Sequence, residues 1–382
     1  MTERLIDAFE KREPYRHPLR GRILAHRVIA KLMIGTSLVL PLHLWNVHNI
    51  NENIEVAENA RINVDIRGEA LDEENGDKAI VFINGFGTYD ANNLVETFGE
   101  GFQEYIQDGQ LWSVNYGNAP LSISEIAERI ITLTEKMGVT RVDLVGYSAG
   151  GDVAVAVNDE IRATSSIDVP LIMGISTPDG TDNLRKEIQD ATRNYLELLG
   201  KAPILAYYDP ARFIGEAMLR QPLYMNDDET INIESFITTM DAILDDLGRK
   251  KFPSTKLLYD QYQAIENIDL EELINNITTK YEPNLLNPTL VYIGTGKGGY
   301  DYMVDDKTSG ANFCKYAADA GLGCLLVNSP NAVHTKPEQS AEEYMQTFAE
   351  ISPELQQMMA QEQNRYIRLT MPIPLNGVNI VR

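Results

Sequence analysis

Unbroken apolar runs, separated by stretches with helical periodicity, most constrain how this chain of 382 residues can fold. The clearest runs are KAIVFING (78–85), LWSVNYG (111–117), VDLVGYS (142–148), VPLIMGIS (169–176), PTLVYIGT (288–295) and CLLVNSP (324–330). Strands without polar alternation are typical of parallel sheets, because helices cover both faces of such sheets. Less regular runs at 54–58 and 61–67 are also expected to be strands. The sequence therefore predicts a mostly parallel sheet of about eight strands.

Apolar residues recur at intervals of three and four between these runs, which predicts helices flanking the sheet. Strand and helix alternate along the chain, as expected for an α/β fold. The interval 177–287 is far longer than one crossover needs and contains several amphipathic segments, so it predicts a helical cap insertion. The core is then expected in residues 51–176 and 288–351. A C-terminal extension, 352–382, has a helical start and an extended end.

Ser148 lies in the motif G-x-S-x-G between a predicted strand and a predicted helix. The motif alone is weak, because three fixed positions recur by chance. Its small neighbours would permit a sharp turn, and the carboxyl end of a central parallel strand faces the crevice where such sheets bind ligands. The positive end of the following helix points to the same place. We therefore expect Ser148 to be a nucleophile rather than an ordinary loop serine.

A serine nucleophile needs a base, and the base needs an orienting carboxylate. His334 is the only histidine that follows Ser148, and it lies in a loop after a predicted strand, at the same edge of the sheet. Asp301 is the first acid after the strand 288–295 and is the preferred carboxylate. The alternative acids are Asp305 and Asp306, a few residues further on, and Asp179 and Asp182 after the preceding strand.

Two backbone amides are expected to stabilise an oxyanion. One is the amide of Ala149, directly after the serine, and the other is the amide of Phe86 in the loop INGFGTYD. Glycines at 85 and 87 would let that loop approach a substrate closely.

In chain order, NGFG (84–87), GYSAG (146–150), the acid in GKGGYD (296–301) and NAVHTKP (331–337) resemble the α/β-hydrolase superfamily over residues 54–176 and 288–351. The resemblance implies a triad of Ser148, Asp301 and His334, with a cap or lid in the insertion. Two features depart from the usual pattern. Asn84-Gly85 stands where His-Gly is common, and the loop before Asp301 is longer than G-x-x-D, so the alternative acids stay open.

These features predict a serine hydrolase of the esterase or lipase type, which cleaves a carboxylic ester or thioester of a small-molecule or lipid substrate through an acyl-enzyme. An ester is favoured because an alkoxide or thiolate leaves more easily than an amine. An acyltransferase with the same triad, a non-catalytic binding protein of the same fold and a lipase at a membrane surface are the alternatives.

Composition and charge argue against other classes of protein. With 33 basic and 56 acidic residues the net charge is −23, which disfavours a nucleic-acid partner. The two cysteines and five histidines lack the spacing of metal ligands, so we expect no metal and no cofactor. GTGKGG (294–299) is not a phosphate loop, because Gly298 follows Lys297 where Ser or Thr is required.

The basic N-terminal segment, residues 1–50, contains the apolar stretch LMIGTSLVLPLHLW at 32–45. A basic flank before an apolar stretch suits a membrane anchor spanning 28–47, but the stretch is short and contains Pro41. An interfacial helix within residues 20–48 and a helix packed on the domain are the alternatives. An anchor would place the catalytic domain outside the cytoplasm, where Cys314 and Cys324 could pair; without one, a cytoplasmic protein is expected.

Overall fold

The computed structural model describes residues 61–370 with short gaps. The gaps are residues 118, 202–208, 221–223, 226–229, 249–254, 282–284, 297–300, 302 and 335–336. The predicted N-terminal segment, the strand expected at 54–58 and residues 371–382 lie outside this part. Within it, no helix has both the length and the apolar character needed to cross a membrane. Residues 20–48, on which the predicted membrane association depends, are not among those described.

Seven strands form one sheet in the described residues, in the order β1-β3-β2-β4-β5-β6-β7. They are β1 (Asn63–Gly68), β2 (Lys78–Ile83), β3 (Gln110–Asn115), β4 (Arg141–Tyr147), β5 (Leu171–Ile175), β6 (Thr289–Thr295) and β7 (Cys324–Ser329). β1 is antiparallel to β3, and every other pair is parallel. The mostly parallel sheet is thus confirmed. The described strands number seven rather than about eight, since the eighth was expected at 54–58.

Burial explains why the central strands lack polar alternation. Every residue of β5 and β6 is buried, whereas the two edge strands β1 and β7 are partly exposed. Successive residues of β2 alternate between two apolar cores: Val81 and Ile83 face one, and Ile80 and Phe82 face the other. A strand buried on both faces needs apolar side chains at every position.

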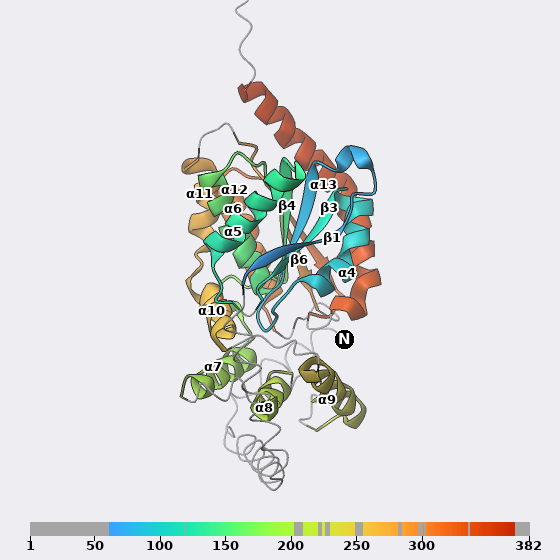
Figure 1. Cartoon of the computed structure of the whole chain (residues 1–382), viewed down its shortest axis with the longest axis vertical. Coiled ribbons are helices and arrows are strands. Elements are labelled where there is room, and N and C mark those ends of the chain that lie inside the picture. Colours follow the sequence, from blue (N-terminus) through green and yellow to red (C-terminus); the bar gives the residue numbers. More distant parts are fainter. Residues whose placement is uncertain are drawn as a thin grey trace, which may run out of the picture.

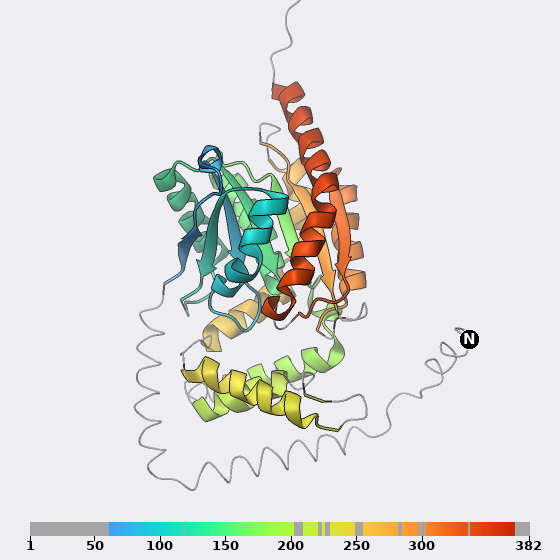
Figure 2. The same ribbon diagram turned by 90° about the vertical axis from the view of Figure 1, so that its right-hand side faces the viewer.

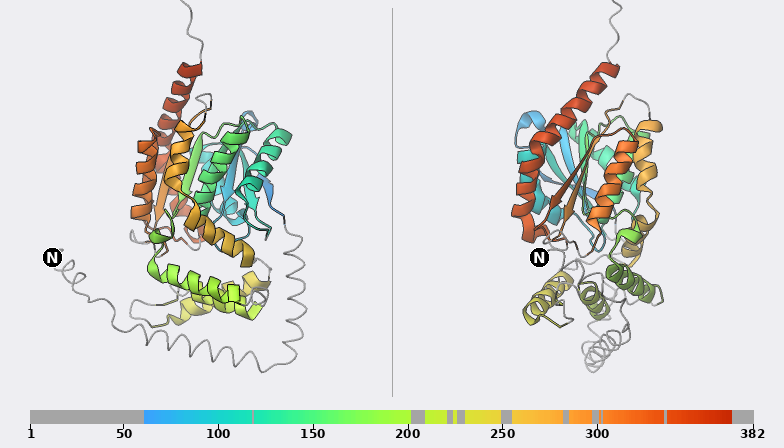
Figure 3. Two further views of the ribbon diagram at one scale, coloured as in Figure 1. Left: turned by 90° about the vertical axis from the view of Figure 1, so that its left-hand side faces the viewer. Right: turned by 180° about the vertical axis from the view of Figure 1, so that it is seen from behind.

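Helices cover both faces of the sheet (Figures 1 and 3). One layer contains α5 (Ile123–Met137), α6 (Ala149–Thr164), α11 (Leu270–Thr279) and α12 (Asp306–Asp319). The other contains α4 (Asn92–Gly101) and α13 (Ala341–Thr370). Short turns of helix complete the fold: η1 (Glu73–Asn75), η2 (Phe102–Ile106), η3 (Thr181–Asn183) and η7 (Pro337–Ser340). The single helix α13 runs across residue 351, where the core was expected to end.

Within the described residues, five α-helices connect β5 to β6, in the range expected to be an insertion. Four of them precede α11: α7 (Lys186–Lys201), α8 (Asp209–Leu219), α9 (Ile233–Gly248) and α10 (Thr255–Asn267). α7, α8 and α9 lie together below the sheet in Figure 1, apart from its helical layers, and Figure 2 shows the same separation. By contrast, α11 packs on α6 and α12, and α10 contacts both α6 and α7. Only the first part of the interval is therefore separate from the core layers.

A disulfide joins Cys314 of α12 to Cys324, the first residue of β7, with a Cα–Cα distance of 5.4 Å. The two cysteines are 10 residues apart, so the bond closes a short loop and ties the helical layer to an edge strand.

Replacing both cysteines with serine is expected to lower the free energy of unfolding by about 3 kcal/mol, because the bond restricts the unfolded chain. Urea denaturation of the double variant measures the difference. Wild-type protein unfolded with a reducing agent is the control and should show a similar loss. An unchanged unfolding midpoint in both would contradict the expectation.

Candidate active site

Ser148 occupies the turn between β4 and α6 in an unusual backbone conformation, with φ 53° and ψ −133°. Its amide donates a hydrogen bond to the carbonyl oxygen of Ile175 at 2.8 Å, which anchors the turn to the end of β5. A positive φ is strained for any residue with a Cβ, and such strain persists where the surrounding structure holds it. The sharp turn predicted from the G-x-S-x-G motif is present.

Two glycines let neighbouring chain segments approach this turn. A Cβ on Gly150 would collide with the carbonyl oxygen of Ile83 at the end of β2. A Cβ on Gly85 would lie 2.7 Å from the Cβ of Ser148 and 2.9 Å from the amide nitrogen of Ala149. The loop after β2 therefore packs directly against the serine turn, and the chain order alone does not show this contact.

A cavity of about 490 Å³ contains both Ser148 and His334. Its walls include the loop after β2, with Phe86, the first turns of α4, and side chains from the separate helices. These are Ile188 and Thr192 of α7, Glu216 of α8 with Arg220 directly after that helix, and Ala242 and Asp245 of α9. No hydrogen bond joins the Ser148 hydroxyl to His334 in the described structure. The two side chains predicted to react nevertheless share one cavity of ligand-binding size.

His334 is paired with Asp301. The distance from His334 Nδ1 to Asp301 Oδ2 is 2.7 Å, and the two residues are only 4% and 2% exposed. Of the five candidate acids, Asp301 is the one hydrogen-bonded to this imidazole. With Nδ1 engaged by the carboxylate, Nε2 is the ring nitrogen left to exchange a proton with another group.

Asp301 is held by three further hydrogen bonds. The Thr295 hydroxyl donates to Oδ2 at 2.7 Å, and the amides of Met303 and Val304 donate to Oδ1 at 2.6 and 3.1 Å. Burial by itself would raise the pKa of Asp301, but the charge of His334 and these hydrogen bonds lower it well below its usual range. The carboxylate therefore stays ionised near neutral pH.

The same ion pair raises the pKa of the imidazole of His334. Burial by itself would lower the pKa of His334, but the charge and hydrogen bond of Asp301, with a contribution from Asp306, raise it above its usual value. The site therefore stabilises a protonated His334.

Asp306 is a second buried carboxylate behind Asp301. It accepts hydrogen bonds from the Tyr292 hydroxyl and the Thr295 amide, both at 2.7 Å, and from the Ser176 hydroxyl at 3.0 Å. Burial and the nearby charge of Asp301 raise the pKa of Asp306 to about 6. Its hydrogen bonds stabilise the start of α12 and the end of β6, so its place is beside Asp301 rather than beside His334.

The other three candidate acids have different surroundings. Asp305 caps α12 by accepting hydrogen bonds from the amide and hydroxyl of Thr308, at 3.4 and 3.0 Å. Asp179 accepts hydrogen bonds from Asn312 and Tyr316, at 2.6 and 3.1 Å. Asp182 is exposed in the short helix after β5.

Tyr147 is a residue of the site that the sequence analysis did not identify. Its hydroxyl donates to the carbonyl oxygen of His334 at 2.5 Å, and the centres of the two rings are 5.5 Å apart. Tyr147 directly precedes Ser148, so one short segment carries the serine and also positions the loop of His334. The only sequence signal was an aromatic residue within the GYSAG motif.

Gln261 of α10 was also not identified. Its side chain is 2% exposed and accepts a hydrogen bond from the Gly87 amide at 3.0 Å while donating to the carbonyl of Thr88 at 2.7 Å. The loop that contains Phe86 is thus held by a helix more than 170 residues away in the chain. No local pattern could have indicated this pairing.

The two amides predicted to bind an oxyanion lie on neighbouring segments. Phe86 lines the cavity, and its ring packs against Tyr262 with ring centres 6.4 Å apart. Ala149 is buried as the first residue of α6. Neither amide donates a hydrogen bond to another described residue. In the described part of the chain, no cluster of three or more His, Cys, Asp or Glu side chains could hold a metal ion.

Comparisons with known proteins give similarity at the level of structure only. No family model matches the chain, and no curated protein matches it. Among solved structures, it is similar to an alpha/beta hydrolase enzyme from a Medee basin deep-sea metagenome library, with 14% identity over 75% of this chain and 92% of that chain, and a TM-score of 0.49. It is also similar to a meta-cleavage product hydrolase from Pseudomonas fluorescens, with 13% identity over 78% and 96% of the two chains and a TM-score of 0.49.

A third similar structure is an esterase from Exiguobacterium antarcticum, with 12% identity over 78% of this chain and 97% of that chain, and a TM-score of 0.47. The values for all three are too low for their activities to be transferred to this chain.

Proposed function

We propose that this protein is a serine hydrolase that cleaves a carboxylic ester or thioester through an acyl-enzyme. Ser148 is the nucleophile, His334 the general base and Asp301 the orienting carboxylate. The observation that carries the proposal is the buried His334–Asp301 pair, with an Nδ1–Oδ2 distance of 2.7 Å, in the cavity that also contains the strained Ser148 turn. Perturbed ionisable groups in a cavity beside a nucleophilic side chain are typical of catalytic sites.

The reaction follows from the roles of the three side chains. His334 Nε2 accepts the Ser148 proton as the hydroxyl attacks the ester carbonyl. Asp301 stabilises the imidazolium that forms. The amides of Phe86 and Ala149 stabilise the negative oxygen of the tetrahedral intermediate. His334 then protonates the leaving alcohol or thiol, and later activates the water that releases the acyl group.

The helices α7, α8 and α9 contribute one wall of the cavity, so in this proposal they act as a cap that shapes the substrate pocket. Gln261 then has a structural reason for its position, because it connects the helical interval between β5 and β6 to the loop carrying the Phe86 amide. A movement of the cap relative to the core would change access to Ser148.

Labelling with a fluorophosphonate probe tests the proposal directly. The probe forms a covalent bond with an activated serine, so wild-type protein should be labelled and the Ser148→Ala and His334→Ala variants should not. Ser124→Ala, at an exposed position, is the matched control and should label like wild type. Labelling of a folded Ser148→Ala variant, or none of the folded wild type even with a small probe, would overturn the proposal.

The rate of ester hydrolysis is expected to fall as the pH is lowered through the pKa of His334. Only the neutral imidazole can accept the serine proton, and Asp301 raises the pKa of His334 above its usual value of about 6.5. The acid limb of kcat/KM should therefore have its midpoint above pH ~6.5. A pH–rate profile with an uncharged ester measures it, and a rate independent of pH between 5 and 8 would contradict His334 as the base.

A further inference from the structure

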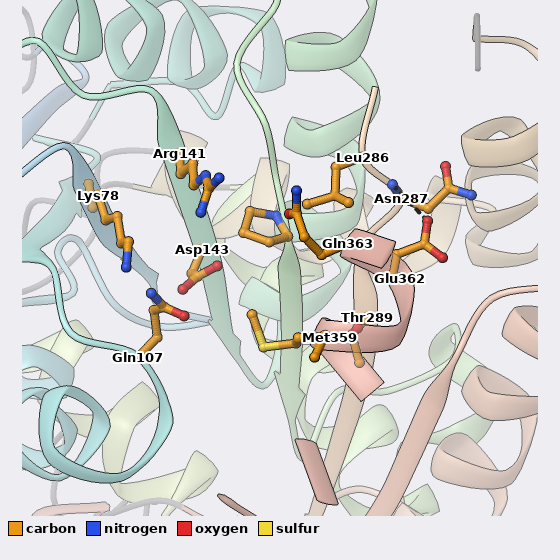
Figure 4. A pocket seen from close by; sticks show the side chains of 13 residues that line it. Lys78, Gln107, Arg141, Asp143, Leu286, Asn287, Thr289, Met359, Glu362 and Gln363 are labelled. Atoms are coloured by element: carbon orange, nitrogen blue, oxygen red, sulfur yellow. Dashed lines mark hydrogen bonds between the residues drawn. The ribbon is translucent and has the colours of Figure 1, made fainter. Parts of the chain in front are cut away.

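A second cavity, of about 210 Å³, lies at the opposite end of the sheet from Ser148. It is formed where strands begin: Lys78 starts β2, Arg141 starts β4 and Thr289 starts β6. The later part of α13 closes it through Met359 and Gln363 (Figure 4). Ser148 follows the carboxyl end of β4, so the two cavities lie at opposite ends of the strands. None of their lining residues is shared.

Asp143 is the unusual residue of this cavity. It is the third residue of β4 and lies on the same face of the strand as the apolar core residue Val145. It is only 3% exposed, and its Oδ1 has no hydrogen-bond partner. Figure 4 shows its carboxyl group pointing into the space between Lys78, Gln107 and Met359.

Burial raises the pKa of Asp143 to about 7, although the charges of Lys78 and Arg141 act to lower it. Leaving a buried polar atom unpaired costs about 1–3 kcal/mol, and native structures rarely do so without a reason. A bound group that donates a hydrogen bond, above all a cationic one, would satisfy this carboxylate.

The cavity also presents positive charge without a bound carboxylate. The guanidinium of Arg141 makes no hydrogen bond or ion pair with a described residue, and the Lys78 ammonium donates to the neutral Asn75 side chain at 2.7 Å. Glu362, on the far side, is already hydrogen-bonded to Arg365 and to the amide of Asn287. The planar fork of an arginine matches a carboxylate in shape and charge.

The remaining walls limit the size and character of a ligand. Pro170, Leu286 and Met359 provide apolar surface between the polar groups. The volume corresponds to about seven water molecules at ~30 Å³ each, which is smaller than a drug-sized pocket. A small molecule with a short aliphatic part fits this combination.

We propose that this cavity binds a small aliphatic zwitterion of the amino-acid type, with its ammonium group on Asp143 and its carboxylate on Arg141 and Lys78. A simple carboxylate would leave Asp143 unpaired, and a simple amine would leave Arg141 unpaired. A molecule with both groups satisfies both side chains at once. The proposal does not depend on the activity of the Ser148 site.

Calorimetric titration of the full chain with three matched probes tests the proposal. L-valine has both charged groups, isobutylamine lacks its carboxylate, and isovalerate lacks its ammonium. L-valine is expected to bind at least ten times more tightly than either, and equally well to Ser148→Ala. No binding of L-valine, or equal binding of isovalerate, would overturn the proposal.

Variants of Asp143 and Arg141 test the binding of the ammonium and the carboxylate separately. Asp143→Asn should reduce L-valine binding to the level of isovalerate, and Arg141→Gln should reduce it to the level of isobutylamine. Lys136→Gln, at an exposed position of α5, is the control and should bind like wild type. Arg141 is partly exposed, so its variant keeps the test available if the buried Asp143 substitution prevents folding. L-valine binding that is unchanged in a folded Arg141→Gln variant would place the ligand elsewhere and overturn the assignment.

Discussion

Replacing Ser148 with alanine is expected to lower kcat for ester hydrolysis by about 10⁴- to 10⁶-fold. Without the hydroxyl no acyl-enzyme can form, and only the oxyanion donors and substrate binding remain to accelerate attack by water. Steady-state kinetics with a small activated ester, supported by an active-site titration of the wild type, measures the loss. Residual activity within a factor of ten of wild type would exclude Ser148 as the nucleophile.

The effect of this substitution on stability separates catalysis from folding. Alanine keeps the Cβ that strains the backbone at φ 53°, so Ser148→Ala should unfold at nearly the same denaturant concentration as wild type. Ser148→Gly removes the Cβ and should raise the free energy of unfolding by about 1 kcal/mol while remaining inactive. A Ser148→Gly variant less stable than Ser148→Ala would show that the turn is not a reservoir of strain.

Replacing Asp301 with asparagine is expected to lower kcat by about 10⁴-fold. The amide would keep the size of the side chain but would lose the negative charge that stabilises protonated His334. Its NH₂ group would also have to face donors, because the present carboxylate accepts hydrogen bonds from His334, Thr295 and two backbone amides. The imidazole would then be held in the wrong tautomer. The kinetic assay is the same, with circular dichroism to establish that the variant is folded.

The alternative acids provide the controls for this prediction. Asp182→Asn and Asp305→Asn change a carboxylate that is not hydrogen-bonded to His334 in the described structure, so each should retain activity within about twofold of wild type. Asp306→Asn removes a buried acid linked to Asp301 through Thr295, and we expect a smaller loss than for Asp301→Asn. A larger loss for Asp306→Asn than for Asp301→Asn would reassign the orienting carboxylate.

The central sheet could be predicted because its signal is local. A strand buried on both faces requires apolar side chains at consecutive positions. β2, β5 and β6 each lie within a predicted run, and β4 begins one residue before its run. The edge strand β1 carries a weaker signal, since exposure permits polar residues, whereas the other edge strand, β7, lies within the predicted run 324–330. The segment 1–50 and the strand expected at 54–58 lie outside the described residues, so the anchor and the eighth strand stay predictions.

The candidate site was predictable only in part, because only some of its residues are marked by a local pattern. Ser148 could be predicted from a short motif in which strand, turn and helix follow one another. His334 could be predicted because it is the only histidine that follows Ser148 in the chain. The carboxylate remained a choice among five acids, because order along the chain does not say which acid contacts the imidazole. Only the three-dimensional structure places Asp301 there, at 2.7 Å from His334.

Contacts between segments that are distant in the chain account for the features that the sequence did not predict. The sequence by itself determined the α/β class, the parallel sheet and the position of the serine turn, since these depend on residues that are neighbours in the chain. The tertiary structure decided which acid pairs with His334, the link from Gln261 to the loop of Phe86, and the cavity around Asp143. These depend on which side chains the packed helices and strands bring together. Such long-range contacts cannot be inferred from the residue pattern of a single sequence.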